Sequence, residues 1–94
     1  RGAILNLKSM DLVYEGEVVN LTKNEFQILR ILFEKAGSVV ARDDLMKELW
    51  NSDCFIDDNT LSVNVARLRK KLEEAGLEHF IETKKGIGYG LSNG

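Results

Sequence analysis

The 94-residue sequence predicts a single α+β domain in which short strands precede and follow three helices. Apolar-rich runs of strand length fill segments 3–21 and 80–91, whereas apolar residues recur at helical spacing between positions 22 and 75. Proline is absent, and glycines punctuate the predicted elements. No repeat, low-complexity tract or linker interrupts this order, so residues 1–94 are expected to form one domain around one modest core.

Three strands are predicted before the first helix. Residues 3–7 and 10–14 are short apolar-rich runs, and residues 18–21 form a third. Glu15 and Gly16 suit a two-residue hairpin turn, because glycine adopts positive φ without steric cost. We expect these runs to pair as a small antiparallel sheet.

The first helix is predicted to begin after Thr22, which forms a capping box with Glu25. Gly37 provides a stop at the C-terminal end, and residues 38–41 suggest a short strand or bridge. Apolar residues follow the cap at helical spacing, namely Phe26, Leu29, Leu32, Phe33 and Ala36.

Two further helices are predicted at residues 42–50 and 59–74, separated by a loop at 51–58. Acidic residues at 43 and 44 suit the positive end of the second helix dipole. Asp57 or Asp58 can cap the third helix. The third helix carries a single apolar stripe, made by Leu61, Val65, Leu68 and Leu72.

A terminal hairpin is predicted from strands at 80–83 and 88–91, with residues 84–87 at its tip. The predicted elements are strands, then three helices with a loop between the last two, then a hairpin. This is the order of elements in a winged helix–turn–helix domain. The glycines between positions 86 and 90 do not form a phosphate-binding loop, since that pattern opens a helix and only four residues follow Gly90.

The composition argues against several classes of protein. No apolar run approaches the ~20 residues of a membrane helix. The single cysteine, Cys54, and the single histidine, His79, are too few for a disulfide or a zinc site. No paired catalytic groups accompany them, so we expect no enzyme, no metal and no cofactor. Because the chain begins with Arg1 instead of Met, we also expect a processed chain or an excised domain.

Charge is unevenly distributed along the chain, although the net charge is only −2. Residues 1–58 carry a net charge of −4 and residues 59–94 carry +2. Segment 59–71 contains four basic residues and no acidic residue. Such a segment is typical either of a nucleic-acid interface or of a solvated helix face.

The third helix has a side opposite its apolar stripe that suits the major groove of DNA. Arg67 can pair with guanine, Asn64 with adenine, and Val63 can contact a thymine methyl group. Lys70 and Lys71 would contact phosphates. The alternative is a solvated amphipathic helix with incidental charges. By helical geometry this side comprises Thr60, Val63, Asn64, Arg67, Lys70 and Lys71.

Four further residues suggest contacts outside the third helix. Lys84 and Lys85, at the hairpin tip, suit a minor groove or a row of phosphates, although a solubilising turn is the alternative. Arg42 opens a helix, where a cation is unfavourable, which suggests a phosphate partner. Trp50 is expected to pack its ring in the core, with an indole N–H that donates to a phosphate if it reaches the surface.

Four motifs in order resemble the C-terminal effector domain of OmpR/PhoB-type response regulators. Residues 21–32 resemble the LTxxEFxLLxxL opening of that family, and residues 40–50 resemble its VxSRxxLxxxxW motif. Residues 59–72 resemble the xTVDVHIxRLRKKL recognition helix, and residues 81–89 resemble the IxTVRGxGYxL wing. The match is in register from about Tyr14 to Leu91.

The resemblance implies specific roles at the DNA. Arg67 would contact bases with Val63 and Asn64 beside it, and Lys85 would enter the minor groove. The loop at 51–58 would face RNA polymerase, through Asp53, Phe55 and Asp57. Phosphate-contacting or positioning roles would fall to Arg42, Trp50, Thr60, Arg69 and Thr83.

The resemblance also implies partners. An N-terminal receiver domain outside this sequence would be phosphorylated on aspartate by a sensor histidine kinase. Two copies would bind direct DNA repeats head to tail, in the cytoplasm of a bacterium, with no membrane contact.

The chain departs from the family pattern at four positions. Lys85 replaces the usual arginine and lacks its planar fork, so we expect weaker insertion into the minor groove. Gly90 removes a possible phosphate contact, and Ala66 leaves a gap where some members place a polar side chain. Ala41 replaces the usual serine N-cap, which costs ~1 kcal/mol of local helix stability.

Two alternatives remain from the sequence. The same fold occurs in membrane-anchored regulators, where a transmembrane helix follows the domain. Here the chain ends three residues after Leu91, which favours a response regulator if that end is natural. The other alternative is a protein-interaction module that lost DNA binding, although such a module has no reason to keep segment 59–71 free of acidic residues.

Overall fold

A three-stranded antiparallel sheet opens the chain in the computed structural model, which describes residues 2–92. Its strands, in spatial order, are β1 (Ile4–Asn6), β2 (Asp11–Tyr14) and β3 (Glu17–Asn20). Glu15 and Gly16 both have positive φ between β2 and β3, which confirms the predicted two-residue turn. The third strand was predicted at residues 18–21, but the tight turn lets pairing begin at Glu17.

Helix α1 (Lys23–Glu34) confirms the predicted capping box. The Thr22 Oγ1 accepts the Glu25 N–H, and Glu25 Oε1 accepts the Thr22 N–H. The buried side of the helix is broader than the apolar side predicted from the sequence, because Ile28 and Ile31 are also fully buried. Helix α1 therefore makes contacts in several directions, with helices α2 and α3 and with strand β6.

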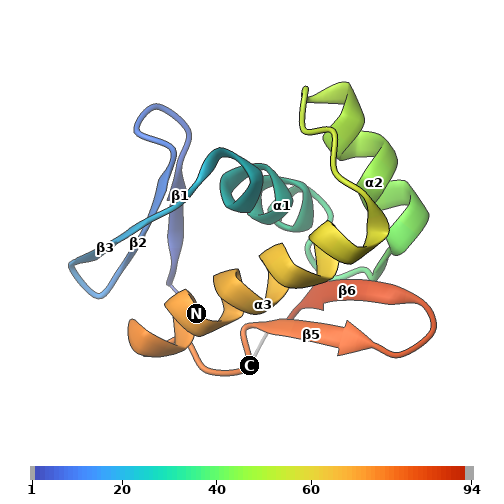
Figure 1. Ribbon diagram of the computed structural model, residues 1–94. Coiled ribbons are helices and arrows are strands. Elements are labelled where there is room, and N and C mark those ends of the chain that lie inside the picture. Colours follow the sequence, from blue (N-terminus) through green and yellow to red (C-terminus); the bar gives the residue numbers. More distant parts are fainter. Residues whose placement is uncertain (1, 93–94) are drawn as a thin grey trace.

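Helices α2 (Arg42–Asn51) and α3 (Asp58–Glu74) form the predicted helix–turn–helix (Figure 1). The short strand β4 (Val40–Ala41) precedes α2, and Ala41 provides no side-chain cap, as its identity predicts. Asp57 is the N-cap of α3, where its Oδ1 accepts the Thr60 N–H at 2.7 Å. The connection between the two helices is thereby reduced to residues 52–57.

The wing consists of β5 (Ile81–Lys84) and β6 (Gly88–Leu91), with β6 paired on its other side to β4. Strand β5 extends through Lys84, which was predicted in the tip, and the tip is therefore residues 85–87. Gly88 allows the close approach of β6 to β4, since a Cβ there would lie 1.9 Å from the Val40 carbonyl oxygen. The wing runs alongside α3 (Figure 1).

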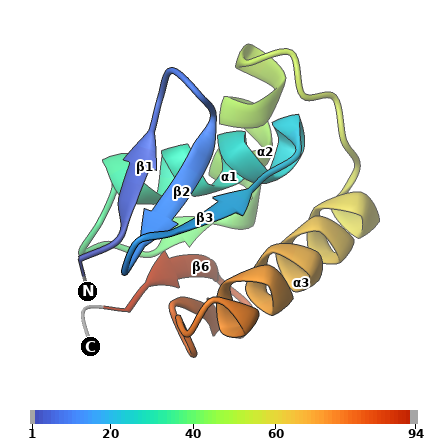
Figure 2. The same ribbon diagram turned by 90° about the vertical axis from the view of Figure 1, so that its left-hand side faces the viewer.

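The core forms where the sheets and the three helices meet (Figures 1 and 2). The predicted apolar stripe of α3 is confirmed, because all four of its residues are at most 2% exposed. Leu45 and Leu49 of α2 and Leu12 of β2 are fully buried in the same cluster. This packing fixes one side of α3 and leaves the opposite side exposed.

Candidate nucleic-acid interface

The exposed side of α3 carries three of the residues predicted to contact DNA. Val63 is 39% exposed, and Arg67 and Lys70 are exposed as well. Within residues 2–92, no hydrogen bond or ion pair engages the side chains of Arg67 and Lys70. We call Val63, Arg67 and Lys70 the exposed basic face of α3.

Two small residues, Ser62 and Ala66, are also exposed on α3 and were not predicted as part of a site. Their positions follow from the same helical geometry, one residue before Val63 and one residue before Arg67. Ser62 Oγ accepts a hydrogen bond from Arg42 Nη2 at 2.8 Å. Helical spacing alone was the signal that could have identified them.

The prediction that Asn64 lies on the outward side is wrong. Asn64 is 8% exposed, and its Nδ2 donates to the Thr60 carbonyl oxygen at 2.9 Å. Position 64 lies three residues after Leu61 and four before Leu68, which places it at the border of the buried stripe. Thr60 is half-buried, with its carbonyl used by Asn64 and its N–H used by Asp57.

Lys71 was predicted to contact phosphate, but its ammonium is engaged within the domain. Lys71 Nζ lies 2.6 Å from Glu25 Oε1 and 3.1 Å from the Asn20 carbonyl oxygen. Glu25 is 2% exposed, so this ion pair compensates a buried carboxylate. No sequence pattern within α1 or α3 signals a pairing that joins two elements 46 residues apart.

Arg42 also has internal partners, although its unfavourable position at a helix start suggested a phosphate partner. Its Nε donates to Asp58 Oδ1 at 2.8 Å, and its other nitrogens donate to the Asp58 carbonyl, Ser62 Oγ and Tyr89 Oη. The hydrogen bond to Asp58 raises the pKa of Arg42 above its usual value. Arg42 thereby connects the starts of α2 and α3 with strand β6, while its side chain stays 30% exposed.

Arg69 and Thr83 hold the wing against α3. Arg69 Nε donates to the Ile81 carbonyl at 3.2 Å, and its Nη2 donates to Thr83 Oγ1 at 2.7 Å. Lys84 forms a 3.4 Å surface ion pair with Glu82. At the wing tip, Lys85 is exposed, and no hydrogen bond or ion pair in the described part of the chain involves it. The wing thus presents one unpaired cation near α3.

An exposed aromatic pair joins the end of α2 to the loop that follows it. The prediction that the Trp50 ring packs in the core is wrong, because Trp50 is 55% exposed and contacts Phe55 edge to face at 5.2 Å. The indole N–H donates to the Ile56 carbonyl at 3.3 Å. Phe55 is 65% exposed, and Asp53 is exposed in a left-handed conformation with φ of 62°.

Two titratable groups of this loop have structural roles. Hydrogen bonds from Thr60 lower the pKa of Asp57, which remains exposed while it caps α3. Burial raises the pKa of the Cys54 thiol, and a protonated buried thiol is chemically inert. Asp57 therefore contributes to the start of α3, and Cys54 contributes to the core.

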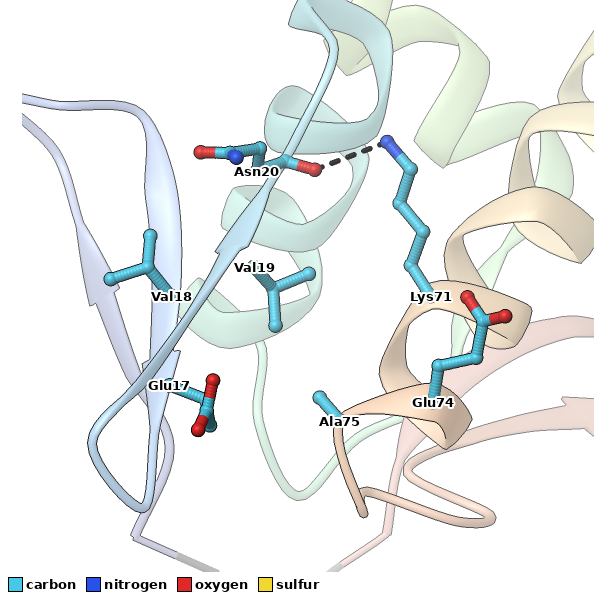
Figure 3. A pocket seen from close by; sticks show the side chains of 7 residues that line it. All are labelled: Glu17, Val18, Val19, Asn20, Lys71, Glu74 and Ala75. Atoms are coloured by element: carbon cyan, nitrogen blue, oxygen red, sulfur yellow. Dashed lines mark hydrogen bonds between the residues drawn. The ribbon is translucent and has the colours of Figure 1, made fainter.

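A groove of about 550 Å³ separates β3 from the last turns of α3 (Figure 3). Glu17 and Glu74 lie at this groove, and Lys71 reaches across it to the Asn20 carbonyl. Two carboxylates make it a poor surface for a polyanion. The exposed basic face of α3 and the wing tip therefore form the candidate interface.

Residues 2–92 contain no cluster of at least three histidine, cysteine or acidic side chains that could hold a metal ion. Nor does that part of the chain contain a helix of the length and apolarity needed to cross a membrane.

Comparison with known proteins gives a family match over most of the chain. Residues 16–91 match the family described as transcriptional regulatory protein, C terminal. The sensory transduction protein BceR of Halalkalibacterium halodurans is 49% identical over 88 residues, which are 94% of this chain and 38% of that relative. The chain thus spans less than half the length of the curated relatives it matches.

Solved structures match both the fold and the extent of the chain. The C-terminal domain of the nisin resistance regulator NsrR, a lantibiotic response regulator, has a TM-score of 0.90 at 39% identity, covering 99% of this chain and 94% of that one. The DNA-binding domain of the response regulator AdeR, solved in complex with an intercistronic region, has a TM-score of 0.84 at 26% identity. That similarity covers 100% of this chain and 96% of the AdeR chain.

Proposed function

Because the chain belongs to the family of OmpR/PhoB-type response-regulator C-terminal effector domains, we propose that it binds specific double-stranded DNA sequences and regulates transcription. The observation that carries this proposal is the distribution of unpaired cations. Arg67 and Lys70 on α3 and Lys85 on the wing have no partner in the described residues, whereas Arg42, Arg69 and Lys71 are paired internally.

The proposed contacts divide into two kinds. Helix α3 enters the major groove, where Arg67 pairs with a base and Val63 contacts a neighbouring one. Lys70 contacts a phosphate, and Lys85 reaches the minor groove from the wing tip. Arg42, Arg69 and Thr83 act mainly by holding α3 and the wing in place, since their polar atoms already bond within the domain.

We propose the remaining partners on the basis of family membership. An N-terminal receiver domain, phosphorylated by a sensor histidine kinase in the bacterial cytoplasm, controls this domain. Two copies bind direct repeats head to tail, which raises effective affinity for a chain whose net charge is −2.

The aromatic pair formed by Trp50, at the end of α2, and Phe55, in the loop after it, is proposed as a surface for RNA polymerase. Phe55 is 65% exposed and contacts Trp50 outside the core, so Phe55→Ala should preserve the fold. We expect this variant to bind DNA normally but to lose activated transcription with purified polymerase. Unchanged activation would contradict the assignment.

The proposal is tested by a salt titration of binding to a labelled random-sequence duplex. We expect the wild-type affinity to fall linearly with salt on logarithmic axes, and Lys85→Ala to make the slope shallower by up to about 0.9. Lys8→Ala is the matched control, since Lys8 is exposed in the β1–β2 connection, away from α3. If the wild-type chain fails to bind even at low salt, a protein-interaction module becomes the better interpretation.

A further inference from the structure

Glu25 is a buried carboxylate that depends on a lysine from another helix. It lies in the first turn of α1 and is 2% exposed. Its Oε1 accepts the Thr22 N–H at 2.9 Å and the Lys71 ammonium at 2.6 Å. A carboxylate removed from water is tolerated when it is paired and hydrogen-bonded, and the loss of its partner is costly. The ion pair with the buried Glu25 carboxylate therefore holds the Lys71 ammonium in place.

Lys71 joins three elements through one ammonium group. Besides Glu25 at the start of α1, it donates to the carbonyl of Asn20, the last residue of β3 (Figure 3). Its own backbone belongs to α3. These bonds oppose both rotation of α3 about its axis and sliding of α3 along α1, because either motion would separate Nζ from at least one acceptor.

Arg67 is the residue whose position this arrangement controls most directly. It precedes Lys71 by four residues, so the two side chains lie one turn apart on the same side of α3. Both line a groove of about 410 Å³ between the first turn of α1 and α3. A small rotation of α3 would displace Arg67, and a bidentate hydrogen-bonded contact between its guanidinium and a base tolerates little displacement.

We propose that Lys71 is a positioning residue for Arg67 and makes no phosphate contact when the domain binds DNA, an inference that rests on the proposed function. Moving the Lys71 ammonium to a phosphate would leave Glu25 charged and buried without its partner. The adjacent Lys70 is free to contact a phosphate, because its side chain is exposed and unpaired within residues 2–92. Two consecutive lysines thus have different tasks.

The test compares Lys71→Met with Lys70→Met, which remove one ammonium each and keep a long side chain. Two quantities are measured while circular dichroism shows each variant to be folded. The first is the salt slope on a random-sequence duplex. The second is the discrimination ratio, which is the affinity for a duplex enriched from a randomised pool by the wild-type chain divided by the affinity for random duplex.

We expect Lys70→Met to make the salt slope shallower by about 0.9 and to leave the discrimination ratio unchanged. Lys71→Met should keep the wild-type slope and lower the ratio by about fivefold or more, the low end of what one bidentate arginine–base pair supplies. Lys71→Arg, which preserves the charge toward Glu25, should restore the ratio.

If Lys71→Met does not fold, the double variant Glu25→Gln/Lys71→Met replaces it. Both charges are then absent, while the glutamine Oε1 still accepts the Thr22 N–H. A slope that falls as in Lys70→Met would overturn the inference in favour of a phosphate contact. An unchanged slope and ratio with a lower melting temperature would also overturn it, leaving a purely structural ion pair. Absence of wild-type binding would instead refute the proposed function.

Discussion

Replacing Arg67 with alanine is expected to weaken binding to the selected duplex by about 10- to 100-fold and to relax the base preference at one position. A bidentate arginine–guanine pair supplies about 1–3 kcal/mol of discrimination, and the charge adds a non-specific contribution. Arg67 is exposed and outside the core, so the free energy of unfolding should stay within about 0.5 kcal/mol of wild type. Quantitative binding to a panel of single-base variants of the selected duplex measures both effects.

Arg67→Lys separates the two contributions of this side chain. Lysine keeps the positive charge and lacks the planar fork. We therefore expect the salt slope of the wild type together with the relaxed base preference of Arg67→Ala. An Arg67→Lys variant that keeps the full preference would show that the charge suffices, and the base contact assigned to Arg67 would then be wrong.

Gly88→Ala is expected to cost about 3 kcal/mol or more of unfolding free energy, because the added methyl group overlaps backbone atoms. The Cβ would lie 1.9 Å from the Val40 oxygen and 2.8 Å from the Ala41 Cα. Neither atom belongs to a flexible side chain, so β6 must separate from β4. That separation would also affect the hydrogen bond from the Arg42 N–H to the carbonyl of Ile87, the last residue of the wing tip.

Gly90→Ala provides the matched control for Gly88→Ala in urea unfolding. A Cβ at Gly90 would meet the Ser38 oxygen at 3.2 Å, a contact that a small adjustment can relieve. We expect the urea concentration at the unfolding midpoint to fall much less in Gly90→Ala than in Gly88→Ala. Equal midpoints for the two variants would mean that the close approach of β4 and β6 does not limit stability.

Local patterns predicted most of the fold because the interactions that define each element lie within a few residues. The capping box of Thr22 and Glu25 spans three positions, and the Glu15–Gly16 turn depends on two. The apolar stripe of α3 repeats within one helix. Such short-range rules gave element boundaries within about two residues of those observed.

The candidate site was predicted less completely, because its geometry depends on contacts between elements. Arg67 and Val63 face outward as helical periodicity predicts, whereas Asn64 lies at the border of the buried stripe and is 8% exposed. The charges of Arg42 and Lys71 were expected at phosphates, but Asp58 and Glu25 pair with them across the fold. Trp50 was expected in the core, yet its ring lies at the surface beside Phe55, with its indole N–H bonded to the Ile56 carbonyl.

The division between paired and unpaired cations has a consequence for divergence among duplicated regulators. Arg42, Arg69 and Lys71 maintain the framework, while Val63, Arg67 and Lys70 project from it. We expect substitutions at Val63 and Arg67, the two residues proposed to contact bases, to alter target choice with little effect on folding, so that a gene copy can acquire a new operator through a few tolerated steps. Framework positions lack that freedom, since each change there disturbs a partner on another element.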